Sequence, residues 1–274
     1  MADITAASVN ALRQRTGLPM MECKRALQQT GGDEEAAMEL IRKEGKKTMS
    51  IRSDRETSSG RIAVYTGNGV GAMIELQCES APVASNTEFM QLANDLAKQL
   101  ATGPGAKTAD ELFGQPSPSK PGQTLADQKD DISNRMREVL KLARLERIDG
   151  NCGSYAHHTG TNGVLAEVTG GTPELAKEVC MHIAAMKPAA VSKEDLDPAV
   201  VAKEREILLE AARKEGKPEN ILEKMVEGRL RNFYAERVLN EQPFVKDEKQ
   251  TVGAIAKQGG MKVVRFIRWE LGKS

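Results

Sequence analysis

The sequence predicts an α+β protein: an N-terminal three-helix module, a duplicated core of antiparallel hairpin-plus-helix units, and an inserted antiparallel helical hairpin. Three observations predict this arrangement. Residues 60–77 and 153–170 share a leading glycine, a Thr-Gly pair and an apolar run, at a constant spacing of 93 residues. Residues 1–45 carry apolar residues at helical spacing between glycine stops. Residues 192–240 contain two charged amphipathic segments joined by a Gly-Lys-Pro turn.

The three helices of residues 1–45 have recognisable ends. Thr5 and Asp33 are suited to cap the first and third helices, and Gly17 to close the first. Met20, Cys23 and Leu27 share one face of the second helix, which we expect to point inward. We expect the third helix to end at Gly45, and the polar residues 46–59 to form a linker.

Two core subdomains follow from the repeat, the first at 60–150 and the second at 151–191 together with 241–274. In each, the hairpin leads into an amphipathic helix, one beginning near Phe89 and the other near Leu175. A further helix carries apolar residues from Ile132 to Ala143 on one face, residues 144–148 read as a third strand, and residues 261–271 as a strand of the second sheet. The helical hairpin at 192–240 interrupts the second subdomain.

Composition narrows the possible functions. The 274 residues include 39 basic and 39 acidic side chains, and this zero net charge argues against binding nucleic acid or acidic membranes by bulk charge. Aromatic residues make up 3% of the chain, too few for a platform that stacks single-stranded nucleic acid. The sequence contains no apolar run of membrane-spanning length and no secretory signal, so we expect a cytoplasmic protein.

The sequence offers no constellation for catalysis or cofactor binding. The four cysteines form no C-x-x-C pair, and we expect them to be reduced. His157 and His158 are expected on a strand, pointing to opposite faces, and His182 lies on an apolar helix face, where a buried structural histidine is the commoner case. The chain also lacks the P-loop, G-x-S-x-G and H-E-x-x-H motifs. We therefore expect no cofactor, no metal site and no covalent chemistry.

Five segments, in order, resemble the bacterial elongation factor Ts family over essentially the whole chain. They are TGLPMMECKRAL, GSYAHHTG with the following GVL, MHIAAMKP, GKPENILEKMVEGRL and QPFVKDEKQTVG. The resemblance implies a guanine-nucleotide exchange factor that binds elongation factor Tu in its GDP-bound and nucleotide-free forms. It also implies that the N-terminal module is similar to a ubiquitin-associated domain and grips the GTPase domain of Tu. The hairpin at 192–240 makes dimer contacts in some members.

The resemblance also assigns contact residues. The family's Thr-Asp-Phe-Val loop, which displaces Mg²⁺ from Tu, corresponds here to Ser80, Ala81, Pro82 and Val83, so its acidic and aromatic residues are missing. The match at His182 implies a contact near the phosphate loop of Tu. From the residues alone, the segment 78–86 also reads as a plain connector with Ser85 as a helix cap.

Met20 and Met21 begin the second helix of the N-terminal module. They are either core residues of that module or soft contacts for Tu.

Three functions remain to be weighed. The first is nucleotide exchange on Tu, and the second is a Tu-binding scaffold or chaperone whose exchange activity is weak because the loop is altered. The third, an RNA-binding ribosome-associated protein, is disfavoured by the neutral charge. The chain stops at Gly272-Lys-Ser, so we expect the C-terminal helix of longer family members to be absent.

Overall fold

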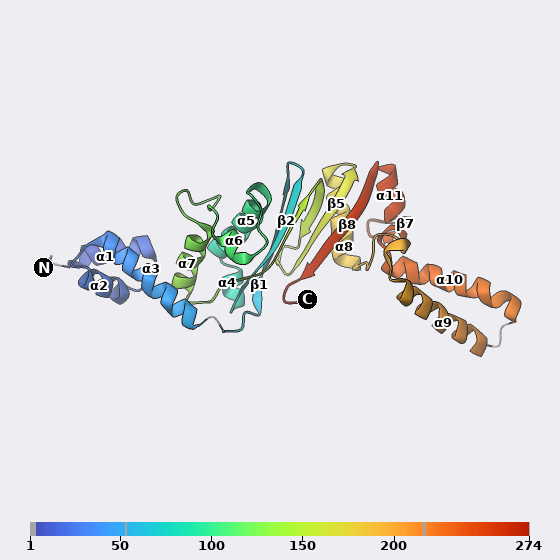
Figure 1. The fold of residues 1–274 in the computed structure, drawn as a ribbon, viewed down its shortest axis with the longest axis horizontal. Coiled ribbons are helices and arrows are strands. Elements are labelled where there is room, and N and C mark those ends of the chain that lie inside the picture. The colour runs from blue at the N-terminus through green and yellow to red at the C-terminus, as the bar shows by residue number, and fades with distance from the viewer. Residues whose placement is uncertain (1–3, 53, 216–217, 274) are drawn as a thin grey trace.

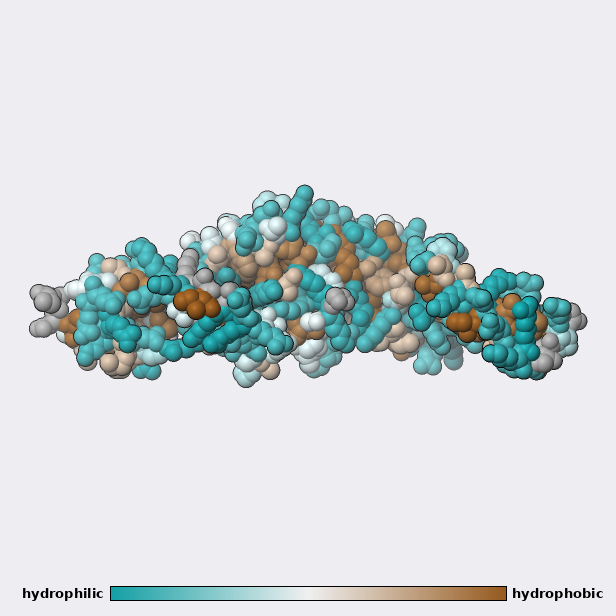
Figure 2. All heavy atoms as spheres, turned by 60° about the horizontal axis from the view of Figure 1, so that its bottom comes forward, coloured by the Kyte–Doolittle hydropathy of each residue, from teal (hydrophilic) through white to brown (hydrophobic). Residues whose placement is uncertain are grey.

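The computed structural model describes residues 4–52, 54–215 and 218–273, and Figure 1 shows their arrangement. The N-terminal helices lie at one end of an elongated molecule and a pair of long helices at the other. Two three-stranded sheets lie between them, each with helices on its outer side. In Figure 2 the visible surface is mostly hydrophilic, with hydrophobic residues in scattered patches. Among the described helices, none is long and apolar enough to cross a bilayer.

The N-terminal module consists of α1 (Ala6–Thr16), α2 (Met20–Gln29) and α3 (Glu34–Ile51). Thr5 caps α1 through the Ser8 amide, and Asp33 accepts the Ala36 amide at 3.0 Å, as predicted. The predicted helix end at Gly45 is wrong, because α3 continues to Ile51 through the first part of the predicted linker. Gly45 faces α7, where a Cβ atom would overlap the side chain of Asn134. This glycine therefore permits a close approach between helices and does not stop one.

Each sheet is a hairpin with a third strand added, as the sequence predicted. The first sheet has the order β1-β2-β3, and the second has the order β4-β5-β8. All neighbouring strands run antiparallel. The strands are β1 (Ser59–Gly67), β2 (Val70–Cys78), β3 (Lys141–Asp149), β4 (Cys152–Ala156), β5 (Asn162–Gly170) and β8 (Met261–Glu270).

The duplication has a different register from the predicted one. Each sheet has a bulge in its third strand, at Ala143 of β3 opposite Glu75 and Leu76, and at Val264 of β8 opposite Glu167 and Val168. Each of these glutamates faces an arginine on the third strand, Arg144 or Arg265. Glu75 and Glu167 are 92 residues apart, so the predicted spacing of 93 does not join structurally equivalent residues. The spacing of 93 matched similar residues across two hairpin turns of different length.

The two sheets pack face to face across a small apolar layer of Ile62, Met73, Ile148 and Leu165. Two glycines at equivalent positions make this approach possible. A Cβ atom at Gly71 would come within 2.7 Å of the Leu165 side chain, and one at Gly163 would overlap Ile62. The two sheets therefore pack closely against each other.

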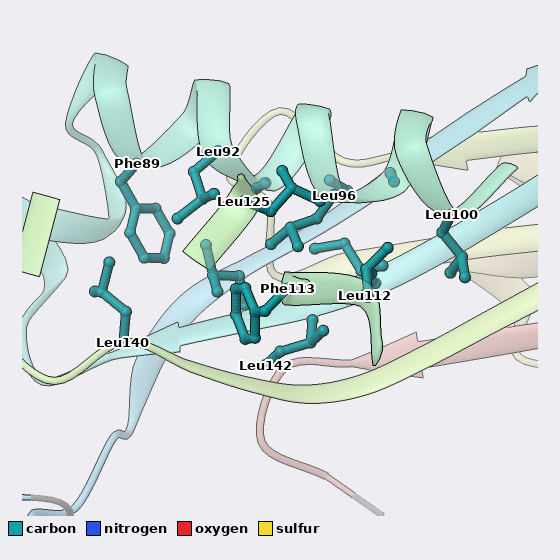
Figure 3. Close-up of a cluster of buried hydrophobic side chains, with 14 of the residues drawn as sticks. Phe89, Leu92, Leu96, Leu100, Leu112, Phe113, Leu125, Leu140 and Leu142 are labelled. Carbon is teal, nitrogen blue, oxygen red and sulfur yellow. The ribbon is translucent and has the colours of Figure 1, made fainter. Parts of the chain in front are cut away.

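Helices cover the outer faces of both sheets. The first sheet carries the short α4 (Ala81–Ala84) with α5 (Thr87–Thr102), α6 (Ala109–Phe113) and α7 (Leu125–Met136), and the second carries α8 (Pro173–Met186) and α11 (Val252–Gln258). Figure 3 shows Phe89, Leu92 and Leu96 of α5 facing Leu140 and Leu142. The predicted continuation of α7 to Ala143 is wrong. The helix ends at Met136 because Arg137 is left-handed, with φ 60°.

The helical hairpin consists of α9 (Pro198–Lys214) and α10 (Glu219–Arg237), in the predicted positions. Its buried contacts include Val226, Leu230 and Phe233. Two single-turn 3-10 helices flank it, at Lys193–Asp195 and Leu239–Glu241. The chain then returns to the second sheet through β6 (Pro243–Phe244) and β7 (Asp247–Thr251). Thr251 caps α11 as predicted, by accepting the Ala254 amide.

Candidate functional site

Residues 80–83 lie at the start of one helical turn, α4, which begins shortly after β2 ends at Cys78. Ser80 is the N-cap of α4, and Pro82 occupies the first turn, where its fixed φ and missing amide proton are tolerated. Ala81 and Pro82 are exposed, whereas Val83 is 8% exposed and packs in the core of the first subdomain. Of the four predicted contact positions, the turn thus offers Ala81 and Pro82 at its surface, and Val83 anchors it from below.

A pair of carboxylates fastens this turn to the chain before β3. Glu138 accepts hydrogen bonds from the amides of Glu79 (3.1 Å) and Ser80 (3.0 Å), and from the Ser80 hydroxyl. In return, Glu79 accepts the Val139 amide at 2.9 Å and the Arg55 guanidinium at 3.1 Å. The Val139 amide, with help from Arg55, holds the pKa of Glu79 below its usual value. The turn is therefore fixed from both sides by charge-assisted hydrogen bonds.

The α4 turn leads into α5 through a separate cap. Asn86, rather than the predicted Ser85, accepts the Glu88 amide at 2.8 Å. On the other side of the turn, burial raises the pKa of the Cys78 thiol to about 12, with a smaller contribution from the nearby Glu138. This thiol is therefore inert at neutral pH, and the turn presents no nucleophile.

Met20 and Met21 form an exposed apolar pair at the start of α2. Their exposed fractions are 49% and 67%. The prediction that Met20 belongs to the inward face is wrong, because Leu18, at 6% exposed, lies inside the module just before the helix. Cys23 and Leu27 point inward as expected. The module thus displays two flexible thioether side chains, a type suited to an adaptable protein contact.

Two consecutive residues, Arg137 and Glu138, contact the start of α2 and the α4 turn. Glu22, beside the methionine pair, forms an ion pair with Arg137. Glu138, the next residue, holds the α4 turn. In Figure 1, α2 and α4 both lie along the lower side of the molecule.

His182 lies inside the second subdomain. Its ring is fully buried, and its Nδ1 accepts the Val245 amide at 3.3 Å, so its Nε2 carries the proton and donates to Gln242 Oε1 at 2.9 Å. Burial lowers the pKa of this imidazole, and the Gln242 hydrogen bond only partly offsets that effect. The ring has a structural role in this conformation, and the contact of His182 with Tu stays a prediction.

His157 and His158 are not on a strand, contrary to the prediction. The strand β4 ends at Ala156, and the two rings lie with their centroids 4.1 Å apart in the following turn. The His158 carbonyl accepts the Arg61 guanidinium at 2.7 Å, and the Gly160 carbonyl accepts the Ile62 amide at 2.7 Å. Both partners belong to the first part of β1.

This second turn lies at the same end of the sheets as α4, because the first residue of β1, Ser59, pairs with Cys78 at the end of β2. Sequence reasoning missed it as a surface feature. The signal was the Thr159-Gly160 pair, which marks a turn starting close after the histidines.

The described residues contain no group of three or more His, Cys, Asp or Glu side chains that could hold a metal ion. The exposed features of this surface are the Ala81-Pro82 pair on its turn, the methionine pair on α2 and the turn at His158. Such an arrangement can bind and displace parts of another protein.

Comparison with known proteins assigns the family. The family model described as "Elongation factor TS" matches residues 79–273. Proteins named "Elongation factor Ts" are similar to this chain: that of Methylococcus capsulatus is 42% identical, over 98% of this chain and 92% of its own length. That of Saccharopolyspora erythraea is 39% identical over the full length of both chains, and that of Kineococcus radiotolerans is 38% identical over 99% of this chain and its own full length. The chain therefore belongs to the elongation factor Ts family of translation elongation factors.

Proposed function

We propose that this chain is a guanine-nucleotide exchange factor for elongation factor Tu, and that it promotes GDP release by disturbing the Mg²⁺ and phosphate site. The support is its family together with the exposed Ala81-Pro82 pair on a turn that Glu138 and Glu79 fasten in place. A rigid exposed turn can enter a neighbouring protein's site without first losing conformational freedom. This turn is the single observation on which the proposal depends.

The physical basis is a competition for the nucleotide pocket. In P-loop GTPases, Mg²⁺ and the phosphate-binding loop hold the phosphates of the nucleotide. A protein that binds the nucleotide-free form more tightly than the GDP form must weaken GDP binding by the same factor. The exchange factor needs only contacts for this, with no covalent step.

In this chain the displacement would be steric. Ala81 carries no charge, and Pro82 is a smaller and stiffer group than an aromatic ring. We predict that the N-terminal module is similar to a ubiquitin-associated domain. Met20 and Met21 would hold this module on the GTPase domain of Tu. The turn at His157, which contacts the first part of β1, would extend the same contact surface.

The test is a stopped-flow measurement of fluorescent GDP release from Tu. Substoichiometric amounts of this chain should accelerate the release, and the double variant Ala81→Asp/Pro82→Phe should accelerate it further, because it restores the family's acidic and aromatic groups. Lys262→Gln, an exposed change on the second sheet, serves as the matched control. No acceleration at saturating concentrations of the unmodified chain would refute the exchange function.

The alternative is a Tu-binding scaffold or chaperone with weak exchange activity. The observation that favours it is the composition of the turn itself, in which Ala81 and Pro82 replace the acid and the aromatic residue. This alternative expects a tight complex with an unchanged rate of GDP release. Titration of Tu by calorimetry, run beside the stopped-flow measurement, distinguishes the two functions.

We also propose that residues 192–240 provide a surface for a second copy of the chain. Val200, Ile207 and Ile221 are exposed apolar residues on α9 and α10. Light scattering coupled to size-exclusion chromatography tests this, with Ile207→Glu as the variant expected to shift a dimer toward the monomer.

A further inference from the structure

Two consecutive residues between α7 and β3 contact both exposed elements described above. Arg137 pairs with Glu22 on α2, and Glu138 binds the first residues of the α4 turn. Along the sequence, Glu22 is 115 residues from Arg137 and Ser80 is 58 residues from Glu138. The two elements therefore come from different parts of the chain. Their relative position therefore depends on this short junction.

Glu138 determines where the α4 turn begins. The Ser80 side chain makes none of the N-cap hydrogen bonds expected of a serine at this position, and its hydroxyl donates to Glu138 instead. The two amides at the start of the turn point to the same carboxylate. An anionic group that accepts several hydrogen bonds from one turn fixes its position and its direction.

Arg137 has a backbone conformation that is unusual for its residue type. Its φ of 60° lies in the left-handed region, where a bulky side chain is strained and glycine is not. This conformation ends α7 and leads the chain directly to Glu138. The Arg137 carbonyl also accepts the guanidinium of Arg52, which follows α3, at 3.3 Å. Both the side chain and the carbonyl of Arg137 thus hold the N-terminal module.

The module also packs against the core where α3 lies along α7. Cavities of about 610 Å³ and 240 Å³ open at the junction of α3 and α7, and both are lined by residues of the module and of the core. Between them, α3 approaches α7 at Gly45, and Arg42 lies 3.6 Å from Asp131. Arg137 adds two polar contacts to this junction, beside the packing of α3 on α7.

We propose that Arg137 and Glu138 are positioning residues that set the methionine pair on α2 and the α4 turn at a fixed relative position, so that both meet one partner as a single preset surface. This inference rests on the proposed function for its consequence, since the partner is the protein whose nucleotide site the turn enters. Preset elements lose less freedom on binding than independent ones. Arg137 thereby increases the affinity for the partner through α2, and Glu138 promotes displacement of the nucleotide through α4.

The first experiment separates these two roles by kinetics. Glu138→Gln keeps the shape of the side chain but loses its charge, and should lower the maximal rate of GDP release roughly tenfold with little change in the half-saturating concentration. Arg137→Gly relieves the backbone strain and removes the guanidinium. It should raise the half-saturating concentration several-fold and leave the maximal rate nearly unchanged.

Two further variants guard against simple unfolding. Ser80→Ala removes one of the three hydrogen bonds to Glu138 and should give a milder form of the Glu138→Gln defect, whereas Arg137→Lys should restore most of the affinity. Lys141→Gln, an exposed change at the start of β3, is the matched control. Equal losses of maximal rate and affinity in both the Glu138 and Arg137 variants, in parallel with melting temperature, would overturn separate positioning roles.

The second experiment uses the chain alone and does not depend on Tu. Spin labels on Gln28→Cys of α2 and Ser85→Cys after α4, with the half-buried Cys152 changed to serine, report the distance between the two elements. The parent should give one narrow distance distribution, which Glu22→Gln and Arg137→Gly should broaden. An unchanged distribution in both variants overturns the inference. If the parent fails to release GDP from Tu while these variants still broaden the distribution, the proposed function fails and the coupling stands.

Discussion

The two halves of the core differ most in the segment between the second strand of each hairpin and the helix that follows. In the first half, residues 79–85 separate β2 from the N-cap Asn86, and in the second only Gly171 separates β5 from the N-cap Thr172. These six additional residues make room for α4, which consists of the four residues Ala81–Ala84. The duplicated framework is the same on both sides, so the exposed turn is an addition to one copy, held by a rigid scaffold.

A second difference concerns the ion pair at each bulge. Glu167 and Arg265 form a solvent-exposed pair at 2.8 Å. Glu75 is the counterpart of Glu167 in the first half and is 1% exposed. It binds Arg144 at 2.9 Å and also accepts the Gly272 amide at 3.1 Å. Arg144 in turn donates to the Glu270 carbonyl. One copy of the same pair has thus become the anchor for the last residues of the chain.

The largest expected effect on stability comes from breaking these two pairs in turn. Glu75→Ala should lower the free energy of unfolding by about 2–3 kcal/mol, because it leaves Arg144 and the Gly272 amide without their acceptor. Glu167→Ala should cost at most about 1 kcal/mol, since exposed ion pairs contribute little. Urea unfolding of both variants makes the measurement. Equal losses would show that the buried pair has no special role.

The next largest effect on stability is expected at the residue ten positions after the N-cap of α5 and of α8. This is Leu96 in the first half and His182 in the second, and both are fully buried. The folded protein keeps His182 neutral and lowers its pKa, so below about pH 6.5 the unfolded chain binds the proton more readily. His182 therefore contributes to the free energy of unfolding above about pH 6.5, and this contribution is lost as the pH falls toward the lowered pKa of its ring in the folded protein.

His182→Leu should remove this acid-dependent loss and cost about 1–3 kcal/mol at neutral pH, because Gln242 then keeps an unpaired oxygen. Urea unfolding between pH 5 and pH 8 checks both parts, at roughly 1.4 kcal/mol per pH unit for a full proton. His158→Gln, on an exposed turn, is the control. An unchanged slope below pH 6.5 in His182→Leu would mean that other groups set the acid dependence.

Local patterns in the sequence were sufficient for most of the framework. The alternating strands, the turn glycines and the caps at Thr5, Asp33 and Thr251 predicted both sheets and the helical hairpin. The apolar stripe of α8 correctly indicated that His182 is buried. Gly45 and Arg137 misled, because a glycine needed for close packing looks like a stop, and a left-handed arginine carries no signal at all.

The site was less predictable than the fold, for a physical reason. The residues that fasten the α4 turn, Glu138 and Val139, are about sixty positions away in the sequence. Their role depends on the pairing of β2 with β3, which only the folded chain brings about. The likeness to the family assigned residues 80–83, but it could not reveal that the Val83 side chain packs in the core of the first subdomain.

The smallest expected effect on stability lies in the added turn itself. The double change Ala81→Asp/Pro82→Phe should alter the free energy of unfolding by no more than about 0.5 kcal/mol, since both positions are exposed and Asp suits the first turn of a helix. Val83→Ala, two residues from Ala81, should cost about 1 kcal/mol or more because it leaves space in the core. Thermal unfolding of the two variants, run beside GDP release, makes the comparison. If Ala81→Asp/Pro82→Phe destabilised the protein as much as Val83→Ala, the turn would be part of the core, and the difference between the two halves would be one of packing alone.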